Sequence, residues 1–205
     1  IYTLKGIAEI VVKGKLDSKE LGSVNHEVLK ALFMTITNAN FDAAAFETEI
    51  KKMLACRNEL RAKINAGPLH DAATFAVSTR EDMLAKAAGV GVLATANEDV
   101  RSLRELIIYG LKGLAAYTHH ALNIGQENQE LYAFVYEALA ATLNDGLSAN
   151  ELVALTLKTG EHGVKAMALL DAANTSKYGN PQISEVNIGV RGNPAILISG
   201  HDFTD

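Results

Sequence analysis

Apolar residues recur at spacings of three and four along much of the chain, which is the period of an amphipathic helix. The clearest run lies between residues 97 and 121, and its members share one face: Leu103, Ile107, Gly110, Leu114, Tyr117 and Ala121. Asn97 has a side chain suited to an N-cap, and Glu98 and Asp99 lie where the helix dipole favours anions. The pattern predicts a helix over residues 98–122.

Two capping-box sequences predict further helix starts. The first, SANE at residues 148–151, precedes a second apolar run at the same spacing, formed by Val153, Leu157, Gly160, Val164 and Met167. The other, STRE at residues 78–81, predicts a short helix that Gly89 ends.

An internal repeat organises these helices. IYTLKGIA at residues 1–8 matches IYGLKGLA at residues 108–115 in six of eight positions, with an offset of 107, the difference between 108 and 1. The same offset relates further identical pairs: Val28 and Val135, Ala31 and Ala138, Leu32 and Leu139, Thr35 and Thr142, and Lys51 and Lys158. A constant offset over three successive helical segments indicates a duplicated unit.

We interpret the repeat as a tandem pair of antiparallel three-helix bundles, so the predicted fold class is mainly α. The first bundle, residues 1–64, has predicted helices over 1–12, 25–38 and 43–64; the second, residues 97–178, has them over 98–122, 129–143 and 149–173. Residues 65–96 form a connector with one short helix. Gly6 and Gly113 are equivalent in the repeat and lie within helices, where glycine costs about 1 kcal/mol relative to alanine. We therefore expect a close helix–helix approach at both glycines.

The pattern changes after YGNP at residues 178–181, a cluster of turn-forming residues. Residues 185–190 alternate polar and apolar side chains, as a half-buried strand does, and residues 195–198 form a short apolar run typical of a buried strand. Residues 179–205 are thus predicted to be the start of an α/β domain, which the sequence cuts short.

Composition excludes several classes of protein. The chain has 205 residues, a formal net charge of −5 and 48% hydrophobic residues, which argues against disorder and against a basic nucleic-acid-binding surface. No apolar run reaches the roughly 18 residues of a membrane span. The single cysteine, Cys56, excludes an internal disulfide and any cysteine-ligated zinc or iron–sulfur site made from this chain alone.

His201 is the residue best placed for chemistry. It follows the predicted strand at residues 195–198 in the sequence SGHD, and ligand sites of open α/β sheets lie at the carboxyl ends of strands. An imidazole there suits a metal ligand or a general base, and Asp202 could orient it. The alternatives are that His201 is a turn or capping residue and that Asp202 caps a following helix.

His119 and His120 are interpreted as cations at a helix C-terminus, and Cys56 as a half-buried, inert thiol.

Several longer motifs resemble the hybrid-cluster proteins, also called prismane proteins or hydroxylamine reductases. They are NEDVRSLREL at 97–106, GLKGLAAY at 110–117, LLDAANT at 169–175, YGNP at 178–181, QISEVNIGV at 182–190, ILISGHD at 196–202 and TITNANFD at 35–42. The resemblance covers essentially the whole chain, and ILISGHD is its most specific motif.

The resemblance implies an iron–sulfur oxidoreductase whose N-terminal domain has two three-helix bundles, followed by two Rossmann-like domains. It implies a cubane iron–sulfur cluster held by four N-terminal cysteines and a hybrid iron–sulfur–oxygen cluster held by histidine, glutamate and cysteine. His201 matches the histidine ligand of the hybrid cluster. The implied reactions are the reduction of hydroxylamine to ammonia and of nitric oxide, with electrons from an external donor protein.

The cluster cysteines of that family, and the glutamate ligand that follows its histidine, have no counterpart in this sequence, and Cys56 lies in no cluster motif. We therefore expect the chain to be an internal piece of such a protein, truncated within the first Rossmann-like domain, and to bind no cofactor and be inactive alone. The alternative is a helical structural or interaction module. We also expect no membrane or nucleic-acid partner, a cytoplasmic location, and self-association if the strand at residues 195–198 is uncovered.

Overall fold

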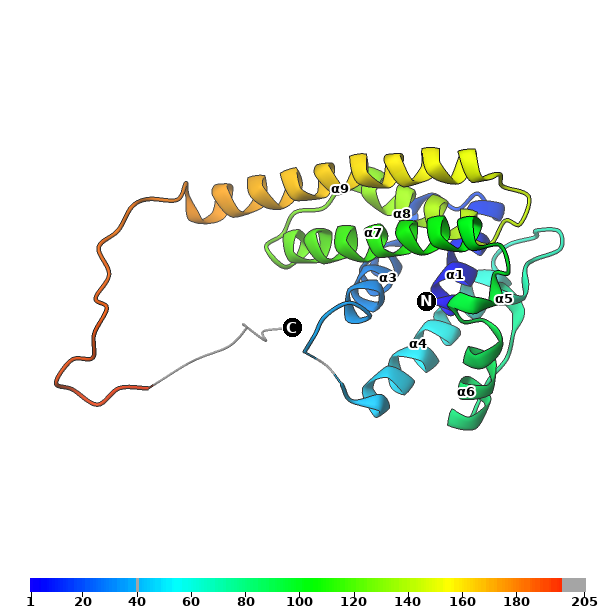
Figure 1. Cartoon of the computed structure of the whole chain (residues 1–205), viewed down its shortest axis with the longest axis horizontal. Coiled ribbons are helices and arrows are strands. Elements are labelled where there is room, and N and C mark those ends of the chain that lie inside the picture. The colour runs from blue at the N-terminus through cyan, green and yellow to red at the C-terminus, as the bar shows by residue number, and fades with distance from the viewer. Residues whose placement is uncertain (40, 197–205) are drawn as a thin grey trace.

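The computed structural model describes residues 1–39 and 41–196, and these residues form a mainly helical fold (Figure 1). The elements, in chain order, are α1 (Tyr2–Lys13), α2 (Ser18–Leu21), α3 (Ser23–Met34), α4 (Ala43–Ala62), α5 (Asp71–Thr74), α6 (Arg80–Gly89), the 3-10 helix η1 (Val92–Ala94), α7 (Glu98–Asn123), α8 (Gln129–Ala141) and α9 (Ala149–Tyr178). The predicted fold class, mainly α, is confirmed. None of the described residues forms a strand, and none of their helices is long and apolar enough to cross a membrane.

The helix bounds follow the sequence repeat. An offset of 107 carries the bounds of α3 onto residues 130–141, and α8 spans Gln129–Ala141. The same offset carries the first residue of α4 onto position 150, one residue after the start of α9. The connector differs from the prediction of one short helix, because it contains α5, α6 and η1.

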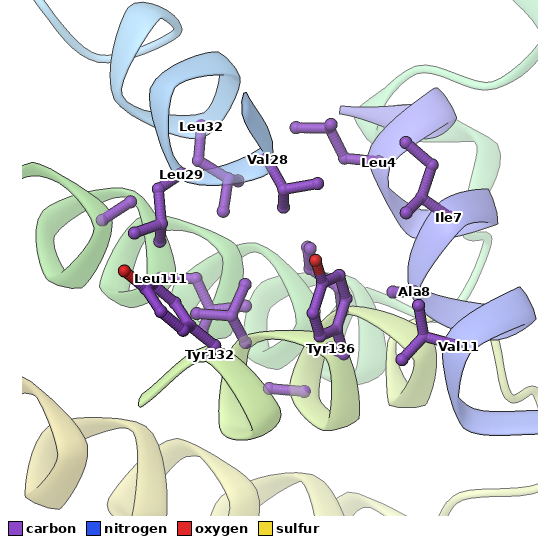
Figure 2. Close-up of a cluster of buried hydrophobic side chains, with 14 of the residues drawn as sticks. Leu4, Ile7, Ala8, Val11, Val28, Leu29, Leu32, Leu111, Tyr132 and Tyr136 are labelled. Atoms are coloured by element: carbon purple, nitrogen blue, oxygen red, sulfur yellow. The ribbon is translucent and has the colours of Figure 1, made fainter. Parts of the chain in front are cut away.

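One hydrophobic core joins the two halves of the repeat. α1 packs mainly against α8 and α4, α3 packs against α7, and α7 lies along α9. Figure 2 shows the result: Leu4 and Ile7 of α1 and Leu32 of α3 face the same interior as Leu111 of α7 and Tyr136 of α8. The helices of the two predicted bundles therefore bury their apolar faces against each other instead of enclosing two separate cores.

A buried polar bridge fixes this arrangement. The Tyr136 hydroxyl donates a hydrogen bond to Asn25 Oδ1 at 2.9 Å, and Asn25 Nδ2 donates to the Ser18 carbonyl at 2.7 Å. Tyr136 and Asn25 are both buried, so either side chain would be costly without its partner. The bridge ties α8 to α3 and to the start of α2.

The predicted caps are largely confirmed. Asn97 accepts from the Val100 N–H at 3.0 Å, and Ser148 forms a capping box with Glu151. The box before α6 lies one residue later than predicted: Thr79 is the N-cap and Asp82 completes the box. Asp82 completes the box in place of Glu81, because its carboxylate accepts hydrogen bonds from the backbone N–H groups of both Ser78 and Thr79. α6 ends at Gly89, as predicted.

The Asp82 cap predicts a specific acid dependence. Hydrogen bonds from Thr79 and Ser78 lower the pKa of Asp82 to about 2, below the value of about 3.9 for an unfolded aspartate. Because the folded pKa is the lower one, the cap contributes its stability above about pH 4 and loses it as the pH falls through about 2. An NMR titration of side-chain carboxyl groups should give a midpoint near 2 for Asp82, and Thr79→Ala should move it upward. A midpoint near 4 in the unmodified chain would contradict the cap.

The two repeat-related glycines have different environments, which corrects the expectation of equal roles. A Cβ atom on Gly6 would lie 2.0 Å from the Ala72 carbonyl oxygen, so α5 approaches α1 closely there. A Cβ atom on Gly113 would meet nothing within 4 Å. On α7 the close approach is at Gly110, where a Cβ atom would lie 2.7 Å from Thr159 Cγ2 of α9. The expectation is confirmed for Gly6 and wrong for Gly113.

The C-terminal segment does not form the predicted strand at residues 185–190. Residues 180–196 extend away from the helices after α9 (Figure 1), and all of them are exposed. A strand needs a hydrogen-bonding neighbour, and the described part of the chain offers none. Of the second predicted strand, Ala195 and Ile196 are described and form no strand, while residues 197 and 198 lie outside the described residues.

Candidate functional site

The predicted ligand His201 and its neighbour Asp202 belong to residues 197–205, outside the part of the chain that the structure describes. The assignment of His201 as a cluster or metal ligand therefore stays a prediction. Among the described residues, no group of three His, Cys, Asp or Glu side chains is arranged to hold a metal ion.

Two histidines without evident partners in the sequence have partners in the fold. His26 Nε2 lies 3.1 Å from Glu127 Oε2, and the Tyr132 hydroxyl donates to the same carboxylate at 3.0 Å. These hydrogen bonds lower the pKa of Glu127 below its ordinary value, that from His26 most strongly. His70 is the N-cap of α5, with Nδ1 accepting from the Ala72 N–H at 3.0 Å. Both side chains act in the packing of the helices.

His119 and His120 lie in the last turns of α7, as the sequence predicts. Their rings lie 5.7 Å and 5.3 Å from the Phe33 ring of α3, centroid to centroid. His119 is buried and His120 is exposed, so the pair straddles the boundary of the core. Both rings therefore pack against α3, and their positive charge stays a prediction.

His162 of α9 is a buried histidine. Its ring stacks on Phe134 of α8, with centroids 3.8 Å apart and planes 11° apart. Nδ1 lies 2.8 Å from the Lys158 carbonyl oxygen, which can only accept, so Nδ1 carries a proton. Nε2 lies 3.5 Å from Glu130, which also pairs with Lys165 at 2.6 Å. The cluster holds α9 against α8.

A cleft of about 570 Å³ lies between α1 and the C-terminal end of α8. Three carboxylates line it, and each has a cation from within the chain: Lys13 lies 2.7 Å from Glu9, Lys158 lies 2.8 Å from Glu137, and Arg104 lies 2.9 Å from Asp145. Glu9 also accepts the His70 N–H at 2.9 Å. Each carboxylate that lines the cleft is thus paired with a cation of the same chain.

Cys56 lies on α4 and is half-buried, as predicted. Burial, followed by the charges of Glu59 and Glu27, raises the pKa of the thiol above its ordinary value. A thiol with a raised pKa has little of the reactive thiolate at neutral pH. The raised pKa favours the interpretation of Cys56 as an inert thiol.

The comparison with known proteins identifies the chain. The model of the Prismane/CO dehydrogenase family matches residues 1–205, the full sequence. The chain belongs to this family. It is 65% identical over 205 residues to a hydroxylamine reductase of Acetivibrio thermocellus, 54% identical over 215 residues to one of Desulfitobacterium hafniense, and 51% identical over 212 residues to one of Clostridium perfringens.

The prismane-family chain spans less than half of each of these relatives. Every residue of the chain is covered in the three matches, but they cover 38%, 38% and 39% of the relatives' lengths. The family membership predicted from the seven motifs is confirmed.

The most buried charged side chain among the described residues of this prismane-family chain was not predicted from the sequence. Arg57 of α4 is 1% exposed and donates to the carbonyls of Ala72 at 3.1 Å and Phe75 at 2.6 Å. Its guanidinium carbon also lies 4.5 Å from the centre of the Phe75 ring. Burial, followed by the charge of Arg61, lowers the pKa of Arg57. Arg57 also donates to the side-chain oxygen of Asn58, at 3.0 Å. No sequence signal marks its burial, because the other two acceptors are backbone carbonyls of the connector.

Proposed function

We propose that this chain is part of a hybrid-cluster oxidoreductase that reduces hydroxylamine to ammonia, with nitric oxide as a further substrate. The observation that carries the proposal is the 65% identity, over the whole chain, to a protein named hydroxylamine reductase. Reduction of hydroxylamine breaks its N–O bond and consumes electrons and protons, so an external electron-donor protein is the expected partner. The cytoplasm is the expected location.

The described residues do not fit the clusters that this family implies. A multi-iron cluster needs several thiolate, carboxylate or imidazole ligands close together. The described part of the chain has one half-buried thiol, Cys56, and no cluster of three such side chains. We therefore assign no step of the reaction to residues 1–39 or 41–196.

In this proposal the helices form the scaffold that leads to the cluster-binding region. The helix bounds that follow the 107-residue offset support a tandem pair of three-helix bundles over residues 1–64 and 97–178, joined by residues 65–96 and packed into one core. Residues 179–205 would begin a Rossmann-like α/β domain in the longer polypeptide. Strand partners would come from residues beyond this sequence.

His201→Ala in the longer polypeptide tests the proposed ligand. We expect the variant to lose the hybrid cluster and hydroxylamine reduction, because an alanine cannot ligate iron. His120→Ala is the matched control, since His120 is an exposed histidine at the end of α7, and it should keep both. Iron content, the visible spectrum and hydroxylamine turnover are the measurements. An intact cluster with normal turnover in His201→Ala would refute the assignment.

The 205-residue chain alone should purify as a colourless protein without stoichiometric iron. The physical reason is the shortage of ligands, since a single imidazole at residue 201 cannot hold a multi-iron cluster. Iron analysis and an absorption spectrum are sufficient. A brown protein with stoichiometric iron would contradict both this expectation and the absence of a cluster site from the described residues.

A further inference from the structure

α9 is apolar on two opposite faces. Its buried face includes Leu152, Ala166 and Ala173. The stripe predicted from the sequence lies on the other side, where Val153, Leu157, Val164 and Met167 are between 45% and 71% exposed. A helix that is apolar on both sides is typical of one that is covered on both sides. The described residues cover only one of them.

α7 has exposed apolar residues as well. Leu106, Tyr109 and Tyr117 are between 43% and 59% exposed, and Leu106, Gly110 and Tyr117 follow one face at helical spacing. Gly110 contacts Thr159 of α9, so the exposed residues of α7 lie beside the line along which α7 and α9 pack. We call the two stripes together the α7–α9 apolar surface; its residues are Leu106, Tyr109, Gly113, Tyr117, Val153, Leu157, Gly160, Val164 and Met167.

Two helical glycines on this surface have no packing role within the described residues. A Cβ atom on Gly113 or Gly160 would meet nothing within 4 Å. Each glycine costs its helix about 1 kcal/mol relative to alanine. A close approach by another part of the protein would explain why both positions lack a side chain, as the approach of α5 does for Gly6.

Two lysines of α9 point to a different neighbour. Lys158 lies 2.8 Å from Glu137 and Lys165 lies 2.6 Å from Glu130, and both carboxylates belong to α8. No charged residue interrupts the stripe positions from Val153 to Met167. The α7–α9 apolar surface therefore suits an apolar protein partner and not a charged ligand.

The segment that follows α9 also leaves apolar side chains uncovered. Ile183, Val186, Ile188 and Val190 are at least 78% exposed, and only a short turn beginning at Gly179 separates them from the end of α9. Two uncovered apolar regions joined by a short connection associate at a high effective concentration, since the second contact is intramolecular. An apolar contact between two copies through α7 and α9 would leave residues 182–196 uncovered.

We propose that the α7–α9 apolar surface is the docking surface for residues 182–196 and the α/β fold that they begin in the same longer polypeptide. The proposal rests on the part of the proposed function that makes this chain a piece of a longer protein. The length of the relatives supports this proposal. The match covers 38% of the first relative, so the remaining 62% lies outside it. That remainder is ample for a fold that covers both helices.

The test uses the double variant Leu157→Glu/Val164→Glu, made in the longer polypeptide and in the 205-residue chain. The matched control is Leu84→Glu/Leu93→Glu, at leucines of α6 and η1 that are 62% and 80% exposed. Hydrogen exchange of α9 and thermal unfolding are measured. In the longer polypeptide we expect α9 to exchange at least about tenfold more slowly than in the 205-residue chain. The double variant should remove this protection, whereas the control should retain it.

In the 205-residue chain the double variant should leave the unfolding midpoint within about 2 °C, because both side chains are already exposed there. Equal exchange of α9 in the two lengths would overturn the proposal. So would a dimer of the 205-residue chain that the double variant dissociates, because the surface would then serve a second copy. The visible spectrum separates the two proposals: slow exchange of α9 without a cluster would refute only the proposed function.

Discussion

Gly6→Ala is expected to lower the free energy of unfolding by about 2–3 kcal/mol, the upper part of the range for overpacked cores. The added methyl group would lie 2.0 Å from the Ala72 carbonyl oxygen and 2.4 Å from its carbon. These are backbone atoms of α5, which cannot turn aside as a flexible side chain can. α5 would have to leave its place against α1, and this cost exceeds the gain of about 1 kcal/mol from replacing a helical glycine.

Gly113→Ala is the matched control, because Gly113 has the equivalent position in the repeat. Nothing lies within 4 Å of the added methyl group, so the substitution should stabilise the 205-residue chain by about 0.5–1 kcal/mol. Urea unfolding of both variants measures the contrast. A Gly6→Ala variant as stable as the unmodified chain would show that α5 is not held against α1 as the structure has it.

Arg57→Met is expected to cost about 3 kcal/mol or more. Methionine keeps much of the apolar stem but leaves the Ala72 and Phe75 carbonyls without their donor, and an unsatisfied buried polar group costs about 1–3 kcal/mol. Because Arg57 is 1% exposed, water has little access to the two carbonyls and cannot readily replace the guanidinium as their donor. The connector segment 70–75 should loosen first, since both carbonyls belong to it.

Arg61→Met is the control for Arg57, one turn further along α4. Arg61 makes one long hydrogen bond, 3.4 Å from the Ala73 carbonyl, and should lose less than about 1 kcal/mol. Urea unfolding gives both values, and hydrogen exchange of residues 70–75 localises the effect. Similar losses in the two variants would mean that Arg57 acts through its bulk and not through the two carbonyls.

Most helices of this chain follow from local rules. Asn97 and Ser148 cap the helices that they were predicted to cap, and the 107-residue offset carries over to the bounds of α3 and α8. The two exceptions have different causes, one local and one tertiary. Thr79 replaced Ser78 as the cap because the Asp82 carboxylate reaches two N–H groups, and residues 185–190 form no strand because the described chain offers no neighbour.

The evidence for the candidate site comes from the sequence alone, because His201 lies outside the residues that the structure describes. His201 was selected from its position after an apolar run and from the motif ILISGHD, and the family match supports the motif. The histidines that the structure does describe are occupied in packing, as His162 is on Phe134 and His70 at the start of α5. Their roles depend on helices that are distant in sequence.

The sequence by itself determined the longer helices, the caps at Asn97 and Ser148, the repeat and the family, because periodicity, capping and motifs are properties of neighbouring residues. Only the tertiary structure decided which apolar face of each helix is covered. It buried Leu152 and exposed Leu157 on the same helix, and it gave Gly6 a neighbour that Gly113 lacks. The reason is that an apolar stripe specifies burial but not the partner, and the partner depends on how all the helices pack together.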